Sequence, residues 1–375
     1  MTDSRQTIRR SLYADEAEAV RALAAAAGLA PGDRAAIAAR AASLVREVRA
    51  GGRPGLVEQF LAEYGLSTRE GVALMCLAEA LLRVPDAATI DDLIRDKIAA
   101  HDWGAHLGSG SILVNASTWA LMLTGRVLEG DAEGIAAALR GLARRLGEPV
   151  IRAAAGRAMR EMGDQFVLGE TIGEALRRSR ERRSQGFTYS YDMLGESART
   201  EADALRYLQA YADAIAAIAA DAKGAVRGNP GISVKLSALH PRFETSQGER
   251  MLPVLAGRLI ELARTAAAAN VGLNIDAEEA DRLDLTLDVV ERVLPDPSLA
   301  GWDGFGLVVQ AYGRRARHVI AWAGELALSL GRRIMIRLVK GAYWDTEIKR
   351  AQVLGLPDYP VFTRKTHTDI AFIAC

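Results

Sequence analysis

Four polar side chains recur near the ends of successive apolar runs in the second half of the chain. Lys235 follows ISV, Asp276 ends LNID, Gln310 ends LVVQ and Arg337 follows IMI. Each alternates with aliphatic neighbours, so in a strand it would lie on the opposite face from them. A buried charge is costly unless it is paired, as Lys235 would be with Asp276. The pattern predicts a polar site in which Arg337 meets an anionic group.

The stretch KGAYW continues the last of these runs into a loop. Lys340 and the backbone amides around Gly341 and Ala342 suit a phosphate or an anionic ring, because glycine permits close backbone approach. Tyr343 and Trp344 offer flat apolar surface to a planar ligand, and the tyrosine adds a hydroxyl for orientation. The alternative is a group of aromatic residues that simply packs on the rim of the fold.

The elements that would position these residues alternate between strands and helices after Gly186. Short β-rich runs occupy residues 187–194, 231–239, 271–278, 304–312 and 332–339. Alternation at this spacing predicts βα units and a parallel sheet. Because the glycine fingerprint of dinucleotide-binding folds is absent, a (β/α)8 barrel is favoured, with its site at the carboxyl ends of the strands. The chain holds only about five such strands, so we expect an incomplete barrel from a longer protein.

The first half of the chain has helical apolar spacing and is rich in Ala, Leu, Arg and Glu. We expect a helical arm over residues 1–65, a helical domain over 66–180 and the first part of the barrel over 181–375. The arginine-rich run at 177–186 is interpreted as the solvated end of a helix, where basic residues complement the helix dipole.

Composition excludes several classes of protein. The 47 basic and 47 acidic residues give zero net charge, which argues against a nucleic-acid partner. Cys76 and Cys375 form no disulfide framework or metal-ligand spacing, so a reducing cytoplasmic location is favoured and no metal is expected. No apolar run is long enough to span a membrane. Binding to a membrane surface stays open, and so does a homo-oligomer.

Long motifs of the chain resemble the proline dehydrogenase domain of the bacterial bifunctional family proline utilization A. They are GNPGISVKLSALHPRFE, LNIDAEEADRLDLTLDV, GLVVQAYGRRA and RIMIRLVKGAYWDTEIKRAQVLGLPDYPVFTRK, and DWGAHLGSGSILVNASTWALMLTGRV resembles the helical domain before that barrel. The resemblance implies an FAD enzyme with a distorted (β/α)8 barrel that oxidises L-proline to 1-pyrroline-5-carboxylate. It also implies transfer of electrons from the flavin to a membrane quinone, which would place the protein in the cytoplasm or on the inner face of the cell membrane.

The resemblance assigns a catalytic set of Lys235, Asp276, Arg337 and Tyr343. Lys235 would help to bind the proline carboxylate, whereas Asp276 and Tyr343 would shape the proline pocket. Gln310 and Arg337 would contact the isoalloxazine ring, with Arg337 near the N5 atom that accepts hydride. The remaining implied positions are a pocket gate at Glu196, which would pair with a later arginine, and FAD-lining residues at Val339, Lys340, Gly341, Ala342, Trp344 and Thr363.

In that family the barrel continues beyond the part represented here, and an NAD-dependent half oxidises glutamate semialdehyde to glutamate. We therefore expect the chain by itself to bind FAD poorly and to oxidise proline slowly or not at all. Two other functions are weighed from the residues alone. One is a Schiff-base lyase with Lys235 or Lys340 as its amine nucleophile, and the other is a non-catalytic helical interaction module formed by residues 1–180.

Overall fold

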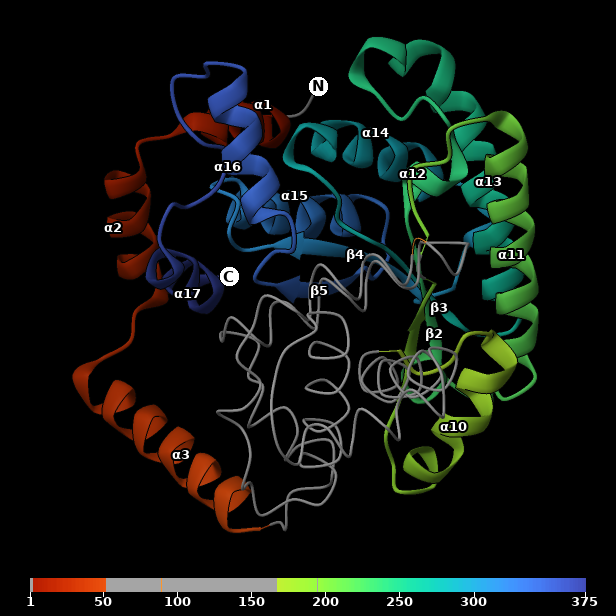
Figure 1. Cartoon of the computed structure of the whole chain (residues 1–375), viewed down its shortest axis with the longest axis horizontal. Coiled ribbons are helices and arrows are strands. Elements are labelled where there is room, and N and C mark those ends of the chain that lie inside the picture. The colour runs from red at the N-terminus through yellow and green to blue at the C-terminus, as the bar shows by residue number, and fades with distance from the viewer. Residues whose placement is uncertain (1–2, 52–88, 90–166, 194) are drawn as a thin grey trace, which may run out of the picture. The chain divides into compact units, whose positions relative to one another are not determined.

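The computed structural model describes residues 3–51, 89, 167–193 and 195–375 (Figure 1). The chain divides into two compact units, one formed by residues 1–34 and 171–375 and the other by residues 35–170. The boundary expected at residue 65, Cys76 and most of the expected helical domain lie outside the described residues. The division into arm, helical domain and barrel therefore stays a prediction.

The first unit is built on a parallel sheet of five strands in the order β1-β2-β3-β4-β5. The strands are β1 (Ser190–Asp192), β2 (Gly231–Val234), β3 (Gly272–Ile275), β4 (Phe305–Gln310) and β5 (Met335–Val339). Each lies within one of the β-rich runs, so the predicted parallel sheet of βα units is confirmed. The second run ends earlier than predicted because residues 236–239 turn into a short helix.

Helices connect consecutive strands and also precede the sheet. They are α10 (Ile172–Ser184), α11 (Glu201–Ala219), α12 (Leu236–Leu239), α13 (Gly248–Ala268), α14 (Leu283–Val293), α15 (Ala316–Ser329), α16 (Trp344–Val353) and α17 (Lys365–Ala374). Thr200 begins α11 with a capping box, in which its hydroxyl accepts from the Asp203 amide at 3.1 Å. The arginine-rich run forms the end of α10, as predicted.

Strand alternation separates an apolar face from a polar face of the sheet. The apolar face carries Val234, Ile275 and Leu307, which are buried where α11, α13 and α15 pack against the strands. On the other face, Arg337 of β5 donates to the hydroxyls of Ser233 in β2 and Ser190 in β1. In a flat sheet β1 and β5 would lie about 19 Å apart, beyond the reach of an arginine. The sheet therefore curls around its polar face as part of a (β/α) barrel.

The N-terminal helices α1 (Asp3–Arg10) and α2 (Glu16–Ala27) belong to the same unit as the sheet. Ile8 is fully buried, and Arg5, only 2% exposed, hydrogen-bonds Asp288 of α14 and pairs with Glu291 at 3.3 Å. Figure 1 shows α2 beside α17, against which it packs. The next helix, α3 (Pro31–Ala50), lies mostly in the second unit.

Candidate active site at the carboxyl ends of the strands

Lys235, directly after β2, forms the centre of the site. Its ammonium donates to Asp192 Oδ1 at 2.8 Å and lies 2.9 Å from Asp276 Oδ2. Burial of the side chain favours a lower pKa, but the hydrogen bonds and negative charges of the two carboxylates outweigh it and raise the pKa of Lys235 well above its ordinary value. Lys235 is therefore a permanent cation, and its predicted pairing with Asp276 is confirmed.

The backbone fixes where Lys235 lies. The Asp276 amide donates to the Val234 carbonyl at 2.9 Å, which extends the parallel pairing of β2 with β3 and sets Lys235 level with Asp276. The Lys235 amide donates to the hydroxyl of Tyr211 in α11 at 3.2 Å. Tyr211 is fully buried, and this burial raises its pKa to about 12. A neutral phenol thus holds the main chain at the point where the strand ends.

Arg337 lies on the same face of the sheet as Lys235. Its guanidinium donates to Ser233 Oγ at 2.7 Å and to Ser190 Oγ at 2.5 Å. Among the described residues, no carboxylate lies within ion-pair distance of Arg337. The side chain is half-buried and its partners are neutral hydroxyls. Such a cation suits an anionic ligand, because charge-assisted hydrogen bonds are stronger than those to neutral groups.

Gln310 ties the loop after β5 to the end of β4. Its side-chain nitrogen donates to the Glu278 carbonyl at 2.9 Å, and its side-chain oxygen accepts from the Ala342 amide at 3.0 Å. Gly341 has a φ of +138°, and a Cβ there would lie 2.4 Å from the ring of Tyr312. The glycine thus lets the backbone approach an aromatic ring of the protein itself.

The aromatic pair after Gly341 has two different environments. The Tyr343 hydroxyl donates to Glu196 Oε2 at 3.3 Å, and burial together with the charge of Glu196 raises the pKa of Tyr343. The phenol therefore stays a hydrogen-bond donor. Trp344 is 40% exposed and donates from Nε1 to the Phe362 carbonyl at 2.8 Å. Its anchored indole leaves apolar surface available to a planar group.

The remaining predicted positions are only partly brought to the site. Val339 is half-buried at the end of β5, but the ammonium of Lys340 pairs with Asp369 in α17. The amide and hydroxyl of Thr363 donate to the carboxylate of Glu16, at 2.9 and 3.0 Å respectively. The contacts of Thr363 therefore run to the N-terminal helix α2 and not to the residues around Lys235.

Sequence reasoning missed Asp192, Ser190 and Ser233. Ser190 and Asp192 lie two positions apart in the run FTYSYDML and so share a face of the strand. In the strand register Asp192 lies opposite Ser233. The alternation rule that identified Lys235 would have identified all three. Applied to the first strand, it puts Ser190 and Asp192 on one face, and in the second strand it puts Ser233, two positions before Lys235, on the same face as Lys235. Glu278, which is 6% exposed, was missed as well, and burial raises the pKa of its carboxyl.

The fold and the site define a (β/α)-barrel protein in which a buried cation lies between carboxylates where the strands end. On the same face of the sheet lies a second cation, Arg337, which has no carboxylate partner in the described part of the chain. Residues 175–375 match the family model described as proline dehydrogenase, and the chain belongs to this family. Residues 2–49 match a model described as the N-terminal domain of the proline utilization A proline dehydrogenase, and residues 56–166 match one described as the DNA-binding domain of proline dehydrogenase.

Curated relatives extend this similarity along the chain. The bifunctional protein PutA of Klebsiella aerogenes is 52% identical over 339 residues, which cover 89% of this chain and 26% of the relative. PutA of Rhizobium meliloti is 51% identical over 373 residues, which cover 98% of this chain and 30% of the relative. This chain thus spans between a quarter and a third of the length of these relatives.

Solved structures give the same result for the fold. A mutant of proline utilization A from Bradyrhizobium japonicum superimposes with a TM-score of 0.68 at 47% identity, covering 97% of this chain and 36% of that one. A structure of proline utilization A with proline bound in remote sites gives a TM-score of 0.69 at 48% identity, covering 97% and 37% respectively.

The match at residues 56–166 conflicts with the expectation of no nucleic-acid partner. That expectation rested on zero net charge over all 375 residues. A sum over the whole chain does not report how charge is distributed on one domain, so it is a weak guide to a local binding surface. As for membranes, none of the helices in the described ranges is both long and apolar enough to cross one.

Proposed function

We propose that this chain carries the flavin and proline site of a proline dehydrogenase, which oxidises L-proline to 1-pyrroline-5-carboxylate. Family membership and the similarity to proline utilization A support this proposal. In the longer protein the electrons would pass to a membrane quinone, with the protein cytoplasmic or peripheral on the inner face of the membrane. NAD-dependent oxidation of glutamate semialdehyde would be the second activity of that longer protein.

The observation that carries the proposal is Arg337, a half-buried guanidinium held by two serine hydroxyls without a carboxylate partner in the described part of the chain. This donor fits FAD, whose isoalloxazine gains negative charge on reduction. Trp344, in the loop that follows the strand of Arg337, offers exposed aromatic surface of the kind that packs against a flat ring. When bound, FAD would supply the two-electron acceptor that no side chain can provide. The protein's part would be to orient the substrate and the flavin and to stabilise the negative charge of the reduced ring.

Lys235 would bind the carboxylate of proline. An ammonium has three donors, and Asp192 and Asp276 use two of them, so one remains for the substrate. The two carboxylates would also offer acceptors for the N–H of the substrate amine. Tyr343, kept neutral by its raised pKa, would shape the edge of the pocket, where its single hydroxyl hydrogen is given to Glu196. These contacts would align the C–H bond next to nitrogen.

The lyase alternative receives less support from the geometry. A Schiff-base nucleophile must be a neutral amine, whereas the carboxylates around Lys235 raise its pKa and keep it charged. Lys340 is paired with Asp369. A separate interaction module is also less favoured for the first helices, because Arg5 and Ile8 are buried in the same unit as the sheet.

Titration of FAD with the protein tests the proposal. Flavin fluorescence should be quenched in a saturable way when the protein is added to a fixed, low concentration of FAD, and protein concentrations well above that of FAD make weak binding measurable. Adenosine diphosphate should compete poorly, because it lacks the ring that Arg337 and Trp344 would contact. A linear, non-saturating response to the protein would contradict the proposal.

A further inference from the structure

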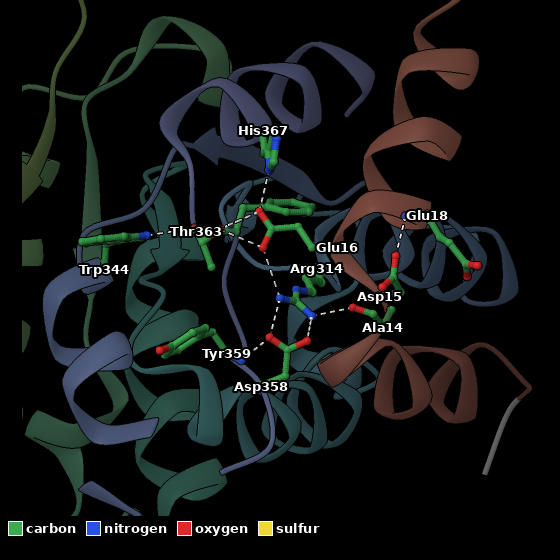
Figure 2. Close-up of polar contacts among 11 residues, drawn as sticks. Ala14, Asp15, Glu16, Glu18, Arg314, Trp344, Asp358, Tyr359, Thr363 and His367 are labelled. Carbon is green, nitrogen blue, oxygen red and sulfur yellow. Dashed lines mark hydrogen bonds and ion pairs between the residues drawn. The ribbon is translucent and has the colours of Figure 1, made fainter. Parts of the chain in front are cut away.

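A partly buried polar network joins the N-terminal helix α2 to the segment between α16 and α17, at residues 354–364. Its centre is Glu16, the first residue of α2, which is separated by about 350 positions from its partners Thr363 and His367. Figure 2 shows the Glu16 carboxylate pointing between Thr363, His367 and Arg314. Neither the proposed chemistry nor the family description accounts for a carboxylate at this place.

Each oxygen of the Glu16 carboxylate has partners. Oε1 accepts from the Thr363 amide at 2.9 Å and lies 2.5 Å from His367 Nδ1. Oε2 accepts from the Thr363 hydroxyl at 3.0 Å and from Arg314 at 3.4 Å. Burial favours a higher pKa for Glu16, but the hydrogen bonds of His367 and Thr363 and the charge of Arg314 lower it below its ordinary value. Glu16 is therefore an anion whose acceptors are all in use.

The second part of the network is Arg314, which is 5% exposed. It holds Asp358 with two parallel hydrogen bonds of 2.6 and 2.9 Å and also donates to the Ala14 carbonyl. One guanidinium thus contacts the turn before α2 and the middle of the segment at residues 354–364. A bidentate pair of this kind fixes orientation as well as distance.

The segment held in this way supports the aromatic wall of the proposed flavin site. Val361 pairs with Gly313 in an antiparallel bridge, and the Phe362 amide donates to the Tyr312 carbonyl at 2.7 Å. The Phe362 carbonyl in turn accepts from Trp344 Nε1 at 2.8 Å. A chain of direct contacts therefore runs from Glu16 through Thr363 and its neighbour Phe362 to the Trp344 indole, as Figure 2 shows in part.

We propose that Glu16 is a positioning residue, which locks the segment at residues 354–364 and thereby holds Trp344 in place for the flavin. The inference rests on the proposed function, because Trp344 matters here as a wall of the FAD site. The N-terminal helix then contributes to cofactor binding from outside the site, without touching the reacting atoms. Glu16 serves this role because its two carboxylate oxygens accept from donors in three different parts of the chain, at Thr363, His367 and Arg314.

The test compares Glu16→Ala and Glu16→Gln with Glu18→Ala in the full chain. Glu18 is exposed on the same helix, and in Figure 2 its carboxylate points away from the network, so it is the matched control. Hydrogen exchange without FAD is read at the amides of Phe362, Thr363, His367 and Thr368. FAD affinity is then read by flavin fluorescence, and circular dichroism confirms that each variant is folded.

Glu16→Ala should speed exchange of these amides about tenfold and weaken FAD binding by a similar factor, because several hydrogen bonds are lost. Glu16→Gln keeps one acceptor oxygen and should show a smaller effect, while Glu18→Ala should show none. Unchanged exchange in Glu16→Ala would overturn the proposal, and so would faster exchange with unchanged FAD affinity. If the parent chain fails to bind FAD, the proposed function fails, and exchange alone decides whether Glu16 locks the segment.

Discussion

Replacing Lys235 with methionine should lower the rate of proline-dependent flavin reduction about 100-fold, because one charge-assisted hydrogen bond to the substrate is lost. It should also lower the free energy of unfolding. Methionine preserves the apolar stem but leaves Asp192 and Asp276 facing one another without their shared cation. Breaking a buried pair costs about 3–5 kcal/mol. Asp192 is 43% exposed, so solvent screens part of its charge. We therefore expect the free energy of unfolding to fall by about 2 kcal/mol.

Urea unfolding measures the stability change, and the matched control is Lys223→Met, which removes an exposed lysine outside the site. The control should change neither stability nor proline oxidation. If Lys235→Met unfolds at the same urea concentration as the control, the carboxylates do not depend on Lys235 for neutralisation. If it retains full activity, Lys235 does not bind the substrate carboxylate.

Replacing Arg337 with methionine should weaken FAD binding about 30-fold, because a charge-assisted contact to the ring contributes about 2 kcal/mol. Stability should change little, since the present partners of Arg337 are the neutral hydroxyls of Ser190 and Ser233. Arg337→Lys should give an intermediate affinity, because an ammonium lacks the planar fork that spans both serines and a ligand.

The control for this change is Arg333→Met, just before the same strand. Arg333 is 85% exposed and pairs only with Asp303 at 3.3 Å among the described residues. Its replacement removes the same charge from the chain without touching the polar face of the sheet. Equal FAD affinities for the two methionine variants would remove Arg337 from the flavin site.

The sequence was a good guide to this site wherever chemistry follows from strand parity. Lys235, Asp276 and Gln310 were predicted to share a face because side chains alternate along a strand, and the register of β2, β3 and β4 supports that placement. The pairing of Lys235 with Asp276 followed from the cost of burying one charge alone. The sheet itself followed from the alternation of short apolar runs with helices.

Parity could not give contacts that depend on curvature or on distant segments. Arg337 reaches Ser190 only because the sheet curls, which alternation along one strand does not encode. Glu16 meets Thr363 across 347 positions, and nothing local marks either residue as a partner of the other. Thr363 was therefore assigned to the flavin from a resemblance alone, and its contacts with Glu16 were not foreseen.

The central claim is that the polar face at the strand ends brings proline to a flavin. Its most direct test is the anaerobic addition of L-proline, with excess FAD, to this chain joined to the remainder of the barrel that its longer relatives carry, followed in the visible absorption band of the flavin. We predict that this band bleaches, however slowly, at a rate that saturates with proline and is lost in Lys235→Met. A flavin that binds saturably yet stays oxidised at every concentration of L-proline would contradict the account.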